Sequence, residues 1–196
     1  MPHIHNEPNQ HDMTISAYII RREDDKWKCL VHFHKKIEML MQIGGHIELD
    51  QTPWQTVAHE LKEESGYRLD ELKILQFTDD RLQESGNVTH PTPLLVNTHY
   101  VGNEHYHSDL CYGFVAKDKA NDDVAQDEST DIRWLTLHQL QSGANNGEVL
   151  KDVLYIYEFL LRNFNKLIPV DTSTYSLDKP LSTGIVYKRG APGQKV

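Results

Sequence analysis

The sequence predicts an α/β fold in which a mixed β-sheet lies between helices. Short segments rich in β-branched and aromatic residues recur along the chain, which is typical of strands. Helical patterns are few and fall once in the first half and again near the end. With 196 residues, the chain suits one domain with a short appendage. Strands with an early and a late helix favour an α/β/α sandwich.

The strands are expected at residues 14–21, 29–34, 39–43, 72–77, 93–101, 107–117 and 131–136. The helices are expected at residues 53–65, 137–141 and 147–163. Residues 1–12 form an expected N-terminal arm, residues 13–167 the domain, and residues 168–196 a C-terminal extension. This extension is either mobile or packed as an edge strand over residues 184–188.

Composition excludes several classes of protein. The formal net charge of −9 disfavours binding to nucleic acid, although a polyanionic small molecule can bind if divalent cations bridge it to carboxylates. No apolar run approaches the length of a membrane span, and the N-terminus lacks the features of a secretory signal. We therefore expect a cytoplasmic protein without a membrane partner. Cys29 and Cys111 are expected to be buried free thiols.

The first helix carries clear boundary signals. Thr52 is an N-cap residue, Pro53 suits the first helical position, and Gln55 completes a capping box. Gly66 provides the stop. A buried stripe is expected on this helix, formed by Trp54, Val57, Ala58 and Leu61.

Three glutamates crowd the end of the same helix. Glu60, Glu63 and Glu64 lie within an arc of roughly 100°, where like charges repel. The helix dipole disfavours negative charge at this end, and Lys62 is the one cation within the cluster. A bound Mg²⁺ would remove both penalties, since it prefers carboxylate oxygens. The alternative is a solvated acidic face.

These residues resemble the Nudix box, whose pattern is G-x5-E-x7-R-E-U-x-E-E-x-G-U, where U is a bulky apolar residue. Over residues 45–67 the pattern departs at Gln51, His59 and Tyr67, which replace a glutamate, an arginine and an aliphatic residue. The matching positions are Gly45, Glu60, Leu61, Glu63, Glu64 and Gly66.

The resemblance implies hydrolysis of a nucleoside diphosphate linked to another moiety, with Mg²⁺ or Mn²⁺ as cofactor. It implies Glu60, Glu63 and Glu64, together with the Gly44 carbonyl, as metal ligands. Glu60, Glu63 and Glu128 are the implied catalytic residues, with Glu60 or Glu128 as the general base. Glu128 lies in an acidic loop ahead of the last strand, so the alternative for it is an ordinary solvated acid.

The two replaced polar positions are expected to work together. In the family the arginine pairs with the first glutamate, and a neutral amide and an imidazole can still hydrogen-bond to each other. We therefore interpret Gln51 and His59 as a support pair that retains catalysis. The alternative is a weakened domain that binds a nucleotide or a protein partner without turnover.

Histidines supply candidate substrate contacts. His46 follows the paired glycines and is expected to reach a phosphate oxygen, while His105 and His107 are expected to line the substrate pocket. An alternative is that His105, His107 and Asp109 converge on a transition metal. The moiety beyond the diphosphate is expected to be read by loops near residues 79–93 and 103–108. A homodimer is an open alternative to a monomer.

Overall fold

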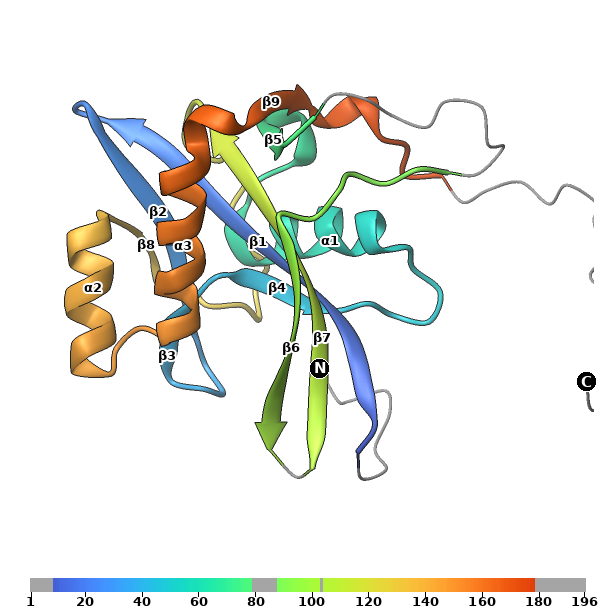
Figure 1. Ribbon diagram of the computed structural model, residues 1–196, viewed down its shortest axis with the longest axis horizontal. Helices are drawn as coiled ribbons and strands as arrows, with labels where there is room; N and C mark the ends of the chain where they lie inside the picture. The colour runs from blue at the N-terminus through green and yellow to red at the C-terminus, as the bar shows by residue number, and fades with distance from the viewer. Residues whose placement is uncertain (1–8, 79–87, 103, 179–196) are drawn as a thin grey trace, which may run out of the picture.

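A computed structural model describes residues 9–78, 88–102 and 104–178 (Figure 1). In these residues the α-helices are α1 (Pro53–Ser65), α2 (Leu137–Asn146) and α3 (Lys151–Asn163). The strands are β1 (His11–Glu23), β2 (Lys26–His34), β3 (Met39–Met41), β4 (Ile43–His46), β5 (Leu72–Gln76), β6 (Leu95–Gly102), β7 (His105–Ala116), β8 (Ile132–Leu135) and β9 (Ile168–Asp171).

All of these strands join one mixed sheet. Its central order is β3-β2-β1-β7-β5-β9, and β4, β6 and β8 pair with β1, β7 and β2 respectively. The long β1 and β7 run parallel, with Thr14 opposite Asp109, whereas the other pairs are antiparallel. The predicted mixed α/β fold is confirmed.

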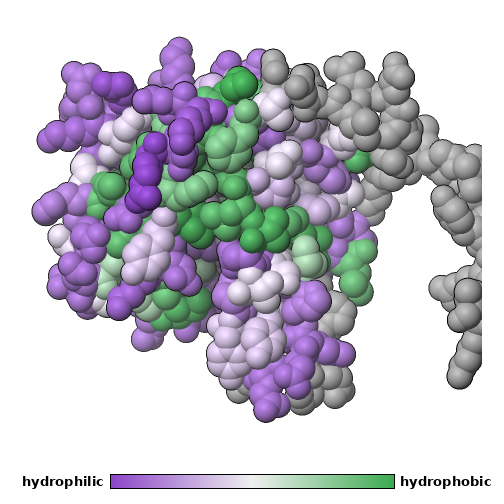
Figure 2. Space-filling view, in the orientation of Figure 1, coloured by the Kyte–Doolittle hydropathy of each residue, from purple (hydrophilic) through white to green (hydrophobic). Residues whose placement is uncertain are grey.

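Helices cover both faces of the sheet (Figure 1). Successive side chains of a strand point to opposite faces, so Tyr18 of β1 packs in the core beneath α2 and α3. Its neighbour Ile19 packs with Trp54 of α1 in a second core. On the face seen in Figure 2, apolar side chains gather at the centre and hydrophilic ones surround them. The result is three layers, with α1 alone on the face that receives the glutamates.

Two boundaries differ from the expected ones because the chain changes partners there. The expected strand over residues 39–43 is divided, since β3 pairs with β2 and β4 with β1. Gly147 takes a left-handed conformation, with φ of 79°, and ends α2. As a result α2 is longer than expected and α3 begins at Lys151 rather than near Gly147.

The chain ends differ from the expected divisions as well. β1 begins at His11, inside the range expected for the N-terminal arm. β9 extends the sheet beyond β5, with Ile74 opposite Val170. The edge strand expected over residues 184–188 lies outside the described residues. In the part of the chain that is described, no helix is long and apolar enough to span a membrane.

The hydroxyl of Tyr157 ties α3 to the sheet. It accepts a hydrogen bond from the Ile19 N–H at 3.3 Å and donates one to the Leu30 carbonyl, and burial raises its pKa. Tyr157→Phe leaves both backbone groups without this partner and should cost about 1–3 kcal/mol of unfolding free energy. Urea denaturation measures this loss, and Tyr155→Phe on the exposed side of α3 is the matched control. Equal effects of the two variants would contradict the prediction.

Candidate active site

Helix α1 begins and ends as predicted. The Thr52 hydroxyl accepts from the Gln55 N–H at 3.3 Å, and the Gln55 side chain accepts from the Thr52 N–H at 2.8 Å. Trp54 is fully buried and stacks on Phe114 of β7, with ring centroids 6.2 Å apart. The helix is therefore held in one rotational setting against the sheet.

That setting separates the three glutamates. Glu60 and Glu64 are only 4% and 6% exposed, while Glu63 is half-buried. The two buried carboxylates face β4, where the Gly44 N–H donates to Glu64 Oε2 at 2.9 Å. Helix α1 thus brings Glu64 against the paired glycines.

The absence of a side chain at position 45 makes this contact possible. A Cβ on Gly45 would lie 2.2 Å from Glu60 Oε1 and 2.7 Å from its Cδ. The Glu60 carboxylate therefore occupies the space that any larger residue would fill.

Burial and mutual repulsion disfavour the ionised form of both carboxylates. Burial, together with the charges of Glu63 and Glu128, raises the pKa of Glu60 to about 7. Burial also raises the pKa of Glu64, and the hydrogen bond from Gly44 offsets only part of this effect. The site thus holds negative charge at a cost that a cation would relieve.

The loop before β8 brings Glu128 towards this charge. The Ala125 N–H donates to the Glu63 carbonyl at 2.8 Å, and the Glu128 N–H donates to the Ala125 carbonyl at 3.0 Å. Lys35 binds the Glu128 carbonyl through its ammonium group at 2.9 Å. Glu128 is close enough to raise the pKa of both Glu60 and Glu64.

The structure differs from the direct hydrogen bond expected between Gln51 and His59. Gln51 Oε1 accepts from the Thr56 hydroxyl at 2.8 Å, whereas His59 Nε2 lies 3.3 Å from Glu63 Oε2. Gln51 precedes the helix, and the six residues of helical rise from Pro53 to His59 extend about 9 Å along its axis. Each side chain therefore finds a partner close to it in the sequence.

Sequence reasoning missed His32 as a site residue. This side chain lies on β2, is 1% exposed, and places Nε2 3.6 Å from Glu64 Oε2. The available signal was a histidine that directly follows the apolar run Cys29–Val31, at a position that alternates to the α1 face.

The three histidines expected to contact substrate meet around Asp12. His46 Nε2 lies 3.1 Å from His107 Nε2 and 3.6 Å from Asp12 Oδ2, which is itself 3.3 Å from His105 Nε2. β1 supplies Asp12, β4 supplies His46, and β7 supplies the other two. The sheet therefore gathers them into one cluster, in which Asp12, His46 and His105 are buried and His107 is partly exposed.

Asp109 does not join these histidines as the alternative metal site required. Its carboxylate accepts from the Thr14 hydroxyl at 2.9 Å and from the Cys111 thiol at 3.0 Å. Within the described ranges, no group of three or more histidine, cysteine, aspartate or glutamate side chains is arranged to hold a metal ion. Cys29 and Cys111 are both buried free thiols, as predicted.

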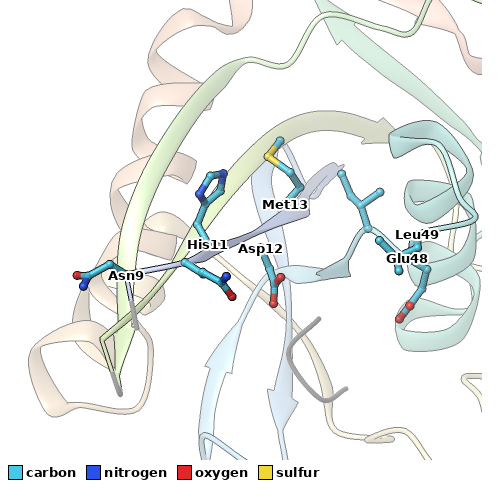
Figure 3. Close-up of a pocket in the computed structure, with 8 residues that line it drawn as sticks. Asn9, His11, Asp12, Met13, Glu48 and Leu49 are labelled. Atoms are coloured by element: carbon cyan, nitrogen blue, oxygen red, sulfur yellow. The ribbon is translucent and has the colours of Figure 1, made fainter. Parts of the chain in front are cut away.

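A pocket of about 560 Å³ opens beside this histidine cluster. Figure 3 shows Asp12 and Met13 on β1, with Glu48 and Leu49 of the loop after β4 at the other side. Asp12 belongs to both the pocket and the histidine cluster, and the charge of Glu48 contributes to the raised pKa of Glu60. The pocket therefore shares Asp12 with the histidine cluster and is bounded on the other side by the loop that carries Glu48.

The raised pKa of Glu60 predicts how the stability of the metal-free protein changes with pH. The folded state keeps this proton up to pH of about 7, whereas the unfolded state releases it near 4.5. The contribution of Glu60 to the unfolding free energy is therefore fully present below pH 4.5 and is lost as pH rises through 7. The loss amounts to about 3 kcal/mol. Urea denaturation with a chelator should show Glu60→Gln becoming more stable than wild type across this window. A difference between the two proteins that is constant with pH would contradict the prediction.

Comparisons with known proteins agree with this architecture. The NUDIX domain family profile matches residues 11–153. No curated protein matches the sequence significantly. The chain therefore has a mixed α/β sandwich carrying a glutamate helix, and it belongs to the Nudix family, which confirms the predicted membership.

Solved structures share the fold. A NUDIX-family hydrolase from Clostridium perfringens has 24% identity and a TM-score of 0.64, covering 78% of this chain and 97% of its own. A C. elegans Ap4A hydrolase binary complex has 15% identity and a TM-score of 0.56, covering 78% and 99%. The NUDIX domain of Shewanella oneidensis NrtR complexed with ADP ribose has 16% identity and a TM-score of 0.56, covering 79% and 88%.

Proposed function

We propose that this protein hydrolyses the pyrophosphate bond of a nucleoside diphosphate linked to another moiety, with Mg²⁺ or Mn²⁺ as cofactor. The observation that supports the proposal most is the pair of buried carboxylates, Glu60 and Glu64, packed against Gly44 and Gly45. Burying two neighbouring carboxylates destabilises the fold, and a purely structural role would not offset that cost.

The carboxylate oxygens of the glutamates are the donor type that a divalent cation such as Mg²⁺ prefers. Among the described residues, Glu60 Oε1 is buried with no hydrogen-bond partner, so a ligand position is available there. Glu60, Glu63, Glu64 and the Gly44 carbonyl would hold the ion. When bound, it supplies neutralisation of the pyrophosphate charge and a lowered pKa for water.

The side chains around the ion have separate tasks. Gly44 orients Glu64 by donating its N–H, and the Glu63 carboxylate has His59 one turn away to position it. We assign Glu60 as the general base, because its carboxylate packs against Gly45 and its Oε1 has no hydrogen-bond partner among the described residues. Glu128 contributes negative charge that raises the pKa of Glu60 in the metal-free protein.

The histidine cluster and the adjoining pocket are the proposed binding sites for the substrate's phosphates and for its second moiety. Imidazole N–H groups of His46, His105 and His107 can donate to phosphate oxygens, and the adjoining pocket of about 560 Å³ is large enough for a nucleoside or similar group. The neighbours described as an Ap4A hydrolase and as an ADP-ribose complex make dinucleoside polyphosphates and ADP-ribose the first substrates to try.

A panel of diphosphates tests the proposal. The panel spans dNTPs, ADP-ribose, nucleotide sugars and dinucleoside polyphosphates, each with Mg²⁺, with Mn²⁺ and with chelator. We expect metal-dependent release of a nucleotide product from one class, lost in Glu60→Gln and largely retained in Glu128→Gln. Tight nucleotide binding without turnover would instead support the binding-module alternative. We further expect no binding to duplex DNA, and light scattering to decide between monomer and homodimer.

A further inference from the structure

His32 stands directly behind the glutamates on the α1 face of the sheet. Its neighbour Val31 packs in the opposite core, whereas Leu30 packs with α1. The imidazole is 1% exposed, and its Nε2 lies 3.6 Å from Glu64 Oε2. Neither ring nitrogen has a hydrogen-bond partner among the described residues.

A buried imidazole without partners is expensive for a fold. Leaving a buried polar group unsatisfied costs about 1–3 kcal/mol, and an aliphatic residue at this strand position would avoid that cost. The unpartnered nitrogen faces a carboxylate that is already assigned to a cation. A bound ligand between His32 and Glu64, rather than another side chain, would therefore supply the missing partner of the ring nitrogen.

We propose that His32 is a nitrogen ligand of the metal site that Glu64 serves, and that it shifts this site's preference from Mg²⁺ towards transition-metal ions such as Mn²⁺. The inference rests on the proposed function, because it takes the glutamates as the carboxylate ligands. Neighbouring ligands of a six-coordinate ion are about 3 Å apart, which a small side-chain rotation reaches from 3.6 Å. Imidazole binds transition metals well, whereas Mg²⁺ favours oxygen ligands.

The test measures the bound metal and not the reaction. Full-length protein stripped with chelator is titrated with Mn²⁺ or Mg²⁺ by calorimetry, and the Mn²⁺ form is examined by pulsed EPR for ¹⁴N coupling. The variants are His32→Leu and His32→Gln, and the matched control is His34→Asn. His34 lies two residues along the same strand, with its ring 6.0 Å away, and Asn keeps an acceptor for the Ile37 N–H.

We expect ¹⁴N coupling in wild type and His34→Asn and its loss in both His32 variants. Mn²⁺ affinity should fall at least about tenfold in those variants, with a smaller change for Mg²⁺. His32→Gln keeps a polar side chain at this position, so it provides the test if His32→Leu does not fold.

Two results would overturn the inference and are separable. Mn²⁺ that binds with no ¹⁴N coupling in wild type, but is lost in Glu64→Gln, removes His32 as a ligand and leaves the proposed function standing. Coupling that persists in the His32 variants has the same meaning. Mn²⁺ binding unchanged in Glu64→Gln would instead remove the glutamate site, and the inference with it.

Discussion

Glu64→Gln should abolish metal-dependent hydrolysis while making the metal-free protein more stable. Glu64 is 6% exposed, and burial together with nearby glutamates raises its pKa. The amide keeps the shape of the carboxylate and its oxygen can still accept from Gly44, but it carries no charge to hold a cation. Loss of a charged metal ligand should lower kcat by about 10³-fold, equivalent to about 4 kcal/mol.

The gain in stability follows from the same charge. Because burial raises the pKa of Glu64, ionising this carboxylate costs more in the folded state than in the unfolded state, and the amide removes that penalty. Thermal unfolding with chelator should therefore show a higher midpoint for Glu64→Gln, and the difference should shrink as the pH is lowered. Glu48→Gln, on the loop after β4, is the control for a general loss of negative charge. A variant that is both inactive and less stable would show that Glu64 supports the fold and not the reaction.

Gly45→Ala should inactivate the protein with little loss of stability, whereas Gly44→Ala should destabilise the fold. A Cβ at position 45 meets the Glu60 carboxylate at 2.2 Å, and a side-chain end can swing away. A misplacement of about 1 Å in a catalytic group costs about 10²-fold in rate. We therefore expect kcat to fall by about 10²-fold with a change of less than about 1 kcal/mol in unfolding free energy.

The adjacent glycine faces backbone instead. A Cβ at position 44 would lie 2.2 Å from the Ile15 carbonyl oxygen and 3.1 Å from Ser16 Cα, within the pairing of β4 with β1. Neither group can move without disturbing the sheet, so Gly44→Ala should cost about 3 kcal/mol. Kinetics and urea denaturation on both variants check the contrast. Equal loss of stability in the two would show that Glu60 cannot move aside, contrary to the prediction for position 45.

Much of this site was readable from the sequence because its signals are local. Thr52 and Gln55 cap the helix from three residues apart, and helical spacing alone places Glu60 and Glu64 on neighbouring turns. The mixed α/β fold was likewise predictable, since strand and helix patterns each depend on a few consecutive residues. Predicted boundaries failed where a strand changed partner or a glycine ended a helix.

The spacing of residues along α1 could not decide which of the glutamates is buried or which side chains of the sheet contact them. Glu60 and Glu63 are three residues apart, but only Glu60 meets Gly45 because Trp54 packs on Phe114 and sets the rotation of α1. Gln51 and His59 were expected to bond, and the axial length of the helix keeps them with separate partners.

The sequence by itself determined the family, the fold class and the crowding of three carboxylates at the end of one helix. Only the tertiary structure placed His32 beside Glu64 and gathered Asp12 with His46 and His107. These residues lie far apart in the chain and meet because parallel and antiparallel pairings bring β1, β2, β4 and β7 into one sheet. Such contacts depend on the register between distant strands, which no short stretch of sequence specifies.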